Sequence, residues 1–170
     1  MKRNFYLLLI ACVSVFFNSC KQDDPEPLKA QVNAELLAGA KGSSKLWKLT
    51  LIMYSEGNDP EAPVNLAACY LDNVYEFTNN DEQSYKATEG GTKCNTADSE
   101  IIEAGHWAFT LDGKILIVLP NESSYSNNVL FSVLTYPSEV LELTEIKLKI
   151  KMNLVDAVNP SSRTLTFEKI

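Results

Sequence analysis

Segments in which apolar and polar residues alternate follow one another along most of the chain. Alternation with a period of two is typical of β-strands that have one face buried and the other in water. Between these segments there is no long helical pattern, so we predict an all-β domain, a sandwich or barrel of about eight antiparallel strands. The predicted strands cover 45–54, 73–79, 84–90, both sides of Asp112-Gly113, 127–136, 139–154 and 163–170.

Two short polar segments predict how neighbouring strands are joined. The segment from Asn79 to Gln83 separates two alternating runs and predicts a hairpin turn. Asp112-Gly113, with strands on both sides, is the dipeptide typical of a type I′ turn. Short turns of this kind join strands that pair as antiparallel neighbours.

The first predicted strand, 45–54, has a strongly apolar set of alternate positions. Trp47, Leu49, Leu51 and Met53 fall in one phase of the alternation. Because successive side chains of a strand point to opposite faces, we expect these four on the same face. The other phase is mixed in character, as expected for a strand at the boundary between core and solvent.

The long predicted strand 139–154 changes its phase of alternation between Thr144 and Ile146. A slip of one residue turns every later side chain to the opposite face. We therefore expect a β-bulge or a sharp bend at this point. We interpret it as curvature of the sheet, in preference to a feature that shapes the mouth of a pocket.

A short helix is predicted before the first strand. Asn33 is a candidate N-cap, because its side chain can accept a hydrogen bond from a free backbone N–H of the first turn. Leu36 and Leu37 would be buried, and Gly39 would end the helix. We place the folded domain at 33–170.

The first residues have the layout of an export signal. Lys2 and Arg3 precede an apolar stretch at 5–17, which is too short to cross a membrane, because crossing needs about 20 residues. A basic start followed by a short apolar middle is typical of a secretory leader. We predict a signal peptide at 1–19.

The four cysteines have different predicted fates. Cys12 leaves with the leader. In an exported protein, an oxidising compartment favours a disulfide between Cys69 and Cys94, which would close a loop of roughly 25 residues. Cys20 has three alternatives: half of a disulfide, a free thiol, or the attachment point of a lipid.

The residues around Cys20 resemble the lipobox of bacterial lipoproteins, in which cleavage leaves the cysteine as the first residue, carrying acyl chains. Ser19 precedes the cysteine as a small residue should, whereas the usual leucine is replaced by Phe17. The resemblance implies a lipid on Cys20 and stable attachment to a membrane, since two or three acyl chains anchor firmly. A leader cleaved nearby without lipid addition is the alternative.

Residues 20–32 are predicted to form a flexible, acidic tether between the lipid and the domain. Two prolines and the acids Asp23, Asp24 and Glu26 leave little to bury. Without the two basic residues of the leader, the formal net charge falls from −7 to −9. An acidic chain without a cluster of Lys or Arg argues against binding of nucleic acid or of anionic lipid.

No pattern indicates catalysis or a bound metal. His106 is the only histidine, and it faces solvent if Trp107 and Phe109 face the core. The chain lacks a G-x-S-x-G nucleophile motif, and two cysteines with one histidine fall short of a four-ligand zinc site. We therefore expect no enzymatic activity, no cofactor and no metal.

Several stretches together resemble the lipocalin-like domain found in lipoproteins of Bacteroidetes-type bacteria. The resemblance extends over 34–170, and it departs from ordinary lipocalins in reading Lys45-Leu46-Trp47 where they have Gly-x-Trp. The matching stretches are LLAGAKGSSKLWKLT, CYLDNVYEF, GGTKCN, GHWAFTLDGKILIV, FSVLTYPSEVLELT and TLTFEKI.

The resemblance implies an eight-stranded antiparallel up-and-down barrel with a short N-terminal helix. It also implies that Trp47 closes one end of the barrel beneath that helix, and it implies no shared chemistry or ligand. The sequence CKQDD after the leader is similar to the export signal of surface lipoproteins in that group. We therefore expect an outer-membrane lipoprotein that is exposed at the cell surface.

An eight-stranded barrel is wide enough either to be filled by its own side chains or to hold one small ligand. In the first case the protein would present its loops to an envelope partner, as an inhibitor or accessory subunit. In the second it would bind a small apolar or amphipathic molecule without catalysis, which we expect, and an interior cavity beyond about 300 Å³ would favour it. The candidate lining residues are Trp47, Phe77, Trp107, Phe109, Tyr125 and Phe131.

Overall fold

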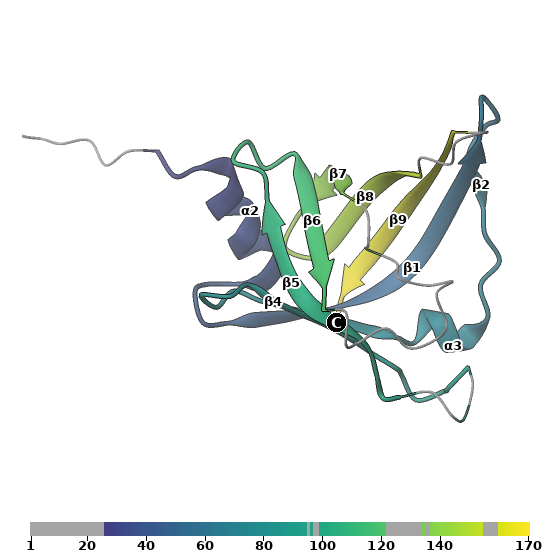
Figure 1. Ribbon diagram of the computed structural model, residues 1–170, viewed down its shortest axis with the longest axis horizontal. Helices are drawn as coiled ribbons and strands as arrows, with labels where there is room; N and C mark the ends of the chain where they lie inside the picture. Colours follow the sequence, from purple (N-terminus) through teal and green to yellow (C-terminus); the bar gives the residue numbers. More distant parts are fainter. Residues whose placement is uncertain (1–25, 95, 97–98, 122–133, 135–136, 155–159) are drawn as a thin grey trace, which may run out of the picture.

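The computed structural model describes residues 26–94, 96, 99–121, 134, 137–154 and 160–170, and these form a closed antiparallel barrel (Figure 1). Eight strands follow one another in the order β1, β3, β4, β5, β6, β7, β8, β9, and β9 pairs with β1 to close the ring. This confirms the predicted fold class. The elements are α2 (Lys29–Ala38), β1 (Ser44–Glu56), β2 (Ala62–Pro63), α3 (Ala68–Leu71), β3 (Val74–Thr78), β4 (Ser84–Thr88), β5 (Ile101–Phe109), β6 (Ile115–Pro120), β7 (Ser138–Leu143), β8 (Lys147–Leu154) and β9 (Ser161–Lys169).

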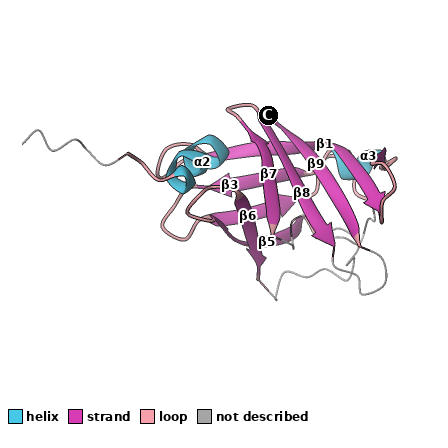
Figure 2. Ribbon diagram, turned by 90° about the horizontal axis from the view of Figure 1, so that it is seen from above, coloured by secondary structure: helices cyan, strands magenta, loops and turns pink. Residues whose placement is uncertain are grey.

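The two described helices lie at opposite ends of the barrel (Figure 2). Helix α2 covers the end where β1 begins, and α3 lies near the end to which β1 runs. Neither helix is long and apolar enough to cross a membrane. The short β2 pairs only with β1, on the outside of the ring.

The start of α2 differs from the prediction. The helix begins at Lys29, inside the segment predicted as tether, and its N-cap is Leu28 in place of Asn33. The Gln31 side chain accepts a hydrogen bond from the Leu28 N–H at 3.2 Å, which satisfies one of the free donors of the first turn. Asn33 lies within the helix and uses its side chain for a tertiary contact. Gly39 follows the last turn with φ +89°, as predicted for the end of the helix.

Strand β1 corrects the predicted face of its apolar residues. Trp47 and Leu49 are buried in the core, but Leu51 is 40% exposed and Ile52 is buried in its place. The pairing with β9 shifts by one residue between Leu49 and Leu51, which marks a bulge at Thr50. A bulge inserts one unpaired residue and so reverses the alternation beyond it.

The phase change between Thr144 and Ile146 is a complete reversal of the chain. The single strand predicted over 139–154 is two strands, β7 and β8, which pair as an antiparallel hairpin. The Thr144 N–H donates to the Lys147 carbonyl at 2.9 Å and closes the turn. A register shift also occurs at Leu141 in β7, so the curvature bulge lies inside the first of the two strands.

The β5–β6 hairpin occurs at Asp112-Gly113 as predicted, but with a different turn. A type I′ turn needs positive φ at both central residues. Among the described non-glycine residues only Gln83 has positive φ, whereas Gly113 has φ +70°. The Gly113 N–H donates to the Thr110 carbonyl at 2.7 Å, so the glycine ends a longer turn that starts at Thr110.

A disulfide joins Cys69 in α3 to Cys94 after β4, as predicted. The segment after β4 is also held by hydrogen bonds to the residues that follow α3. The Thr92 N–H donates to Asp72 Oδ2 at 2.8 Å, and the Gly90 N–H donates to Asn73 Oδ1 at 3.3 Å. The disulfide therefore links α3 to a segment after β4 that is also hydrogen-bonded to the residues just before β3.

Candidate functional site

The inner wall of the barrel has two halves of different chemistry, which we call the helix half and the loop half. Strand β1 leads away from α2, and its register with β9 pairs Trp47 with Lys169 but Tyr54 with Arg163. The helix half therefore contains the inward residues nearest α2, namely Trp47, Phe77, Trp107, Leu116 and Leu148. The loop half contains Ile52, Tyr54, Met152, Glu103 and Arg163, together with the hydroxyl groups of Tyr75 and Tyr85.

Trp47 closes the helix half, as the resemblance implied. Its ring is fully buried, and its Nε1–H donates to the Leu37 carbonyl of α2 at 2.8 Å. Burial of an indole removes roughly 150–250 Å² from water, which stabilises by about 4–6 kcal/mol at 25 cal/mol/Å². The hydrogen bond satisfies a carbonyl at the end of the helix, which would otherwise be buried without a partner.

Lys45, two positions earlier on the same face of β1, holds the end of α2. Its Nζ donates to the carbonyls of Glu35 and Leu36, at 3.1 and 2.8 Å, and to Glu145 Oε2 at 2.6 Å. A cation is stabilised at the carboxyl end of a helix, where unpaired carbonyls carry partial negative charge. Lys45 and Trp47 therefore explain why a Lys-x-Trp sequence begins the first strand.

Two further contacts fix α2 against hairpin loops. Asn33 Nδ2 donates to the Gly113 carbonyl at 2.8 Å, and Asn79 Nδ2 donates to the Gly39 carbonyl at 2.8 Å. The Ala30 N–H also reaches the Leu111 carbonyl at 3.4 Å. The helix is therefore a fixed cap, held by polar bonds along its length.

The predicted lining residues Phe77 and Trp107 fill the barrel in the helix half. Both are buried, with ring centroids 6.1 Å apart in an edge-to-face arrangement, and Trp107 makes a similar contact with Phe109 at 5.9 Å. Trp107 Nε1–H is shared between the carbonyls of Thr78 and Ser84. Such contacts are typical of a packed core.

The loop half contains a carboxylate on the inner wall. Glu103 is only 6% exposed and lies in the same phase of β5 as Trp107. The Tyr85 hydroxyl donates to Glu103 Oε2 at 3.4 Å. Burial of a charged group costs several kcal/mol unless hydrogen bonds compensate it, and the Tyr85 hydroxyl supplies one such bond.

Two tyrosines surround this carboxylate and keep their protons. Burial raises the pKa of Tyr75, and the negative charge of Glu103 adds to the effect, against a hydrogen bond to Asn73 that lowers it. Burial and the Glu103 charge raise the pKa of Tyr85 as well. Both hydroxyl groups are therefore neutral donors at physiological pH.

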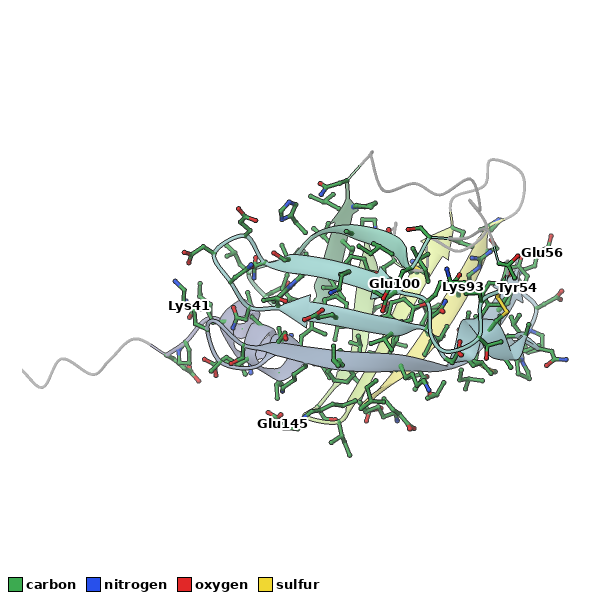
Figure 3. The ribbon with its side chains drawn as sticks, turned by 90° about the horizontal axis from the view of Figure 1, so that it is seen from below. Lys41, Tyr54, Glu56, Lys93, Glu100 and Glu145 are labelled. Atoms are coloured by element: carbon green, nitrogen blue, oxygen red, sulfur yellow. A yellow bond between two sulfur atoms is a disulfide. The ribbon has the colours of Figure 1, made fainter. Side chains whose placement is uncertain are left out.

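Arg163 lies on the inner wall of β9. It shares its phase with the core residues Leu165 and Phe167, and it pairs across the sheet with the buried Met152 of β8 and with Tyr54 of β1. Figure 3 labels Tyr54 at the end of the barrel away from Lys41, which lies beside α2. Arg163 therefore lies in the loop half, near the rim.

A cleft of about 690 Å³ lies at the other end of the barrel, between α2 and the β3–β4 turn. Phe109, predicted to line an interior pocket, borders this cleft at the rim. Most of the other lining side chains are polar. They include Gln31, Glu35, Lys41, Asn79, Asn80, Asp81 and Gln83. The cleft is therefore separate from the apolar interior in which a ligand was predicted.

The residue types that could carry out catalysis or bind a metal do not gather at a site on the inner wall of the described barrel. His106 lies on the outer face of β5 as expected, and its Nδ1 is 3.0 Å from the Glu82 carbonyl. In the part of the chain that the structure describes, no three His, Cys, Asp or Glu side chains form a group that could hold a metal. Cys20, Tyr125 and Phe131 lie outside the described residues, as does the strand predicted at 127–136 except for Leu134.

Sequence reasoning missed Lys45, Glu103, Arg163, Tyr75 and Tyr85. The signal for two of them was the alternation itself. Since Trp107 and Phe109 were placed inside, the same phase of β5 places Glu103 inside, and the phase of Leu165 likewise includes Arg163.

The sequence was also compared with known proteins. It matches no protein-family model and no curated protein.

Proposed function

We propose that this protein binds a small, mainly apolar molecule in the loop half of its barrel, without catalysis, while a lipid on Cys20 anchors it to the cell envelope. The observation that carries the proposal is the buried carboxylate of Glu103, with the Tyr85 hydroxyl bonded to it. Ionisable groups whose pKa values are strongly shifted by burial, as those of Tyr75 and Tyr85 are, are concentrated at functional sites. A few convergent polar groups on an apolar wall are typical of small-molecule sites.

The fixed cap supports access from the loop end. Helix α2 is bonded to β1 and to two hairpin loops, so its displacement would break several polar contacts at once. Among the described residues, the side chains directly behind it, such as Trp47, Phe77 and Leu148, are apolar and fully buried. A ligand would therefore enter from the opposite end and meet Glu103, Tyr75 and Tyr85 there.

The proposed location depends on the leader, the lipobox-like residues before Cys20 and the acidic tether. The disulfide between Cys69 and Cys94 supports export, because such bonds persist mainly in oxidising compartments. We assign the protein to the outer membrane, facing the cell surface. Mass spectrometry of the N-terminal peptide should find acyl chains on Cys20, and Cys20→Ser should lose both the acyl mass and membrane retention. Protease added to intact cells should cleave the protein, and protection until lysis would contradict the surface location.

Native mass spectrometry of the protein purified from its own host tests the ligand directly. We expect an additional mass that solvent extraction removes and that chromatography identifies as a small organic molecule. Glu103→Gln, which removes the charge and keeps the shape, should lower the occupied fraction. Lys86→Gln, on the outer face of β4, is the matched control. A protein that carries no small molecule and binds none from a host lipid extract would contradict the proposal.

A second candidate function is contact with an envelope protein, and an exposed apolar patch favours it. Leu46, Ile146 and Ile170 are exposed, and backbone hydrogen bonds bring them together: Ile170 N–H to the Leu46 carbonyl, and Lys169 N–H to the Ile146 carbonyl. Exposed apolar clusters are typical of interaction sites when they are contiguous. Crosslinking on intact cells should then give one specific adduct, which Ile146→Asp removes.

A further inference from the structure

The cleft between α2 and the β3–β4 turn differs in chemistry from the barrel interior. Its volume of about 690 Å³ lies within the range of roughly 300–1,000 Å³ that is typical of small-molecule sites. Four carboxamide side chains line it from two sides: Gln31 belongs to α2, and the turn contributes Asn79, Asn80 and Gln83. A carboxamide is uncharged and carries two N–H donors and one carbonyl acceptor. The cleft therefore offers both kinds of hydrogen-bonding group to a ligand.

The two sides of the cleft are held in place by bonds that use the asparagines. The Asn79 N–H donates to the Ser43 carbonyl at 2.8 Å, and the Asn79 carbonyl accepts from the Gly42 N–H at 2.7 Å. The Asn80 side chain accepts from the Ser84 N–H at 2.9 Å and so closes the turn. The cleft is thus formed before a ligand binds, and a preformed site lowers the entropic cost of binding.

The two glutamines keep hydrogen-bonding groups that no other described residue uses. Gln31 accepts from the Leu28 N–H through Oε1, so the donors on its Nε2 remain available. The half-buried side chain of Gln83 makes no hydrogen bond within the described residues, although its backbone is bonded to Asn80 and Trp107. Gln83 is also the only described non-glycine residue with positive φ, +50°, a conformation that glycine adopts more readily. The turn thus carries a free amide at a position where a glycine would be less strained.

The charged and aromatic groups of the cleft restrict the ligand further. Lys41 and Asp81 pair with each other at 2.7 Å, so their charges cancel, and the exposed Glu35 carboxylate leaves the lining with one net negative charge. An anion is therefore repelled. Phe109 is half-buried and adds an apolar surface at the rim, where its ring packs edge to face on Trp107. Together these groups favour an uncharged ligand that has several hydroxyl groups and one apolar face.

We propose that this cleft binds a neutral mono- or disaccharide. Each hydroxyl group of a sugar both donates and accepts, which matches the amides of Gln31 and Gln83, and the Glu35 carboxylate accepts a charge-assisted bond from a further hydroxyl. The C–H groups on one face of a sugar ring pack on an aromatic side chain, here Phe109, whose ring supplies apolar area. The site lies at the end of the barrel opposite the loop half, so it does not depend on the proposed function.

The test compares sugars that differ only in charge. Glucose, galactose and mannose are each titrated beside the matching uronate, in which a carboxylate replaces the CH₂OH group, and binding is followed by amide chemical shifts in NMR spectra. The protein is the mature chain carrying Cys20→Ser, which keeps every described residue. We expect at least one sugar to shift the signals of Gln31 and of the turn 79–83 in a saturable way. Its uronate should bind about two- to fivefold more weakly, which is the size of an exposed charge interaction.

Variants assign the binding to single side chains. Gln83→Gly removes the amide and should lower the affinity for the sugar about two- to tenfold, the loss of one or two hydrogen bonds. Its urea midpoint should change little, because relief of the positive φ offsets the flexibility that glycine adds to the unfolded chain. Glu35→Gln removes the charge and should abolish the difference between sugar and uronate. Asn58→Gly is the matched control, because it removes an exposed carboxamide in the turn after β1, at the end of that strand away from α2. It should change neither affinity.

The outcomes decide this inference independently of the ligand in the loop half. Absence of a saturable shift of the cleft signals with all three sugars, or equal affinity for a sugar and its uronate, would overturn the assignment of a neutral carbohydrate. Unchanged sugar affinity in Gln83→Gly would place the binding elsewhere and overturn it as well. Native mass spectrometry of Gln83→Gly should still find the small molecule of the loop half, and its loss would contradict the separation of the two sites.

Discussion

The two halves of this barrel are built from the same strands and differ in what their inner walls carry. In the helix half, large side chains such as Trp47 and Phe77 are packed to zero exposure beneath a fixed cap. In the loop half, the wall carries Glu103, Arg163 and two tyrosine hydroxyls. The first arrangement buries a large apolar area, whereas the second places a buried carboxylate and a partly buried guanidinium on the inner wall.

The comparison indicates that the two halves have different roles along the barrel axis. A packed, capped half stabilises the ring without regard to any ligand. The other half can then hold groups that oppose folding, because the stability comes from elsewhere. Substitutions in the helix half should therefore lower the stability of the protein more than substitutions in the loop half.

The largest effect is expected at the cap. Trp47→Ala removes a fully buried ring and the hydrogen bond to the Leu37 carbonyl, and should lower the free energy of unfolding by about 3–5 kcal/mol. Urea denaturation followed by circular dichroism measures it. Trp47→Phe keeps most of the apolar area and should cost less. A loss below about 1 kcal/mol for Trp47→Ala would show that the cap is not the stabilising half.

The disulfide should have the next largest effect. It closes a sequence separation of 25 residues, so reduction should lower stability by about 3 kcal/mol in the chain-entropy description. Urea midpoints with and without reductant measure it. The Cys69→Ala, Cys94→Ala double variant serves as the control, because reductant should leave it unchanged. Equal midpoints for the oxidised and reduced wild-type protein would contradict the prediction.

High pH should weaken the protein through the loop half. The folded-state pKa values of Tyr75 and Tyr85 are raised above the ordinary value of 10.0, chiefly by burial. Below pH 10 both states hold these protons. Above it the unfolded state releases them while the folded state does not, so stability falls by about 1.4 kcal/mol per pH unit for each tyrosine.

Unfolding by urea between pH 9 and 11 measures this slope. Tyr85→Phe should make the decline with pH shallower, because one raised group is gone. Since the lysines titrate in both proteins, the difference between the two slopes isolates the tyrosine. The same slope in both proteins would mean that the Tyr85 hydroxyl is in contact with solvent.

The smallest effect on stability is expected at Glu103. Glu103→Met keeps the volume and removes the cost of the buried charge, but it also leaves the buried Tyr85 hydroxyl without its acceptor. The two effects oppose each other, so the free energy of unfolding should change by less than about 1 kcal/mol. The same variant should lose the bound small molecule. Glu76→Met, on the outer face of β3, is the control and should not affect binding. A destabilised Glu103→Met protein that keeps its ligand would contradict the proposed role of this residue.

Much of the fold could be predicted because it depends on local pattern. Alternation placed most of the described strands, and short polar segments placed the turns at Asn79 to Gln83 and at Asp112-Gly113. The errors arose where a single residue changes the phase. The bulge at Thr50 moved Leu51 outward, and the reversal after Thr144 divided one predicted strand into two. The alternation of apolar and polar residues shows where its phase changes, but backbone hydrogen bonds decide whether a bulge or a turn forms there.

The candidate site was predicted less well, because the prediction chose aromatic residues as the lining and overlooked the charged ones. Phe77 and Trp107 turned out to be core. Glu103 and Arg163 are charged residues in phase with core positions, and a strand taken alone does not show that both walls meet around them. Lys45 was also missed, because its partners on α2 are brought to it only by the fold.

The sequence by itself determined the antiparallel β-fold, the turn positions and the pairing of Cys69 with Cys94, because each follows from local alternation or from the count of cysteines. Closure of β9 on β1 and the capping of one end by α2 were decided by the tertiary structure. The tertiary structure also decided that Glu103 lies close to Tyr75 and Tyr85. The physical reason is distance along the chain: a barrel interior joins side chains from strands far apart in sequence, and no local pattern records which of them face each other.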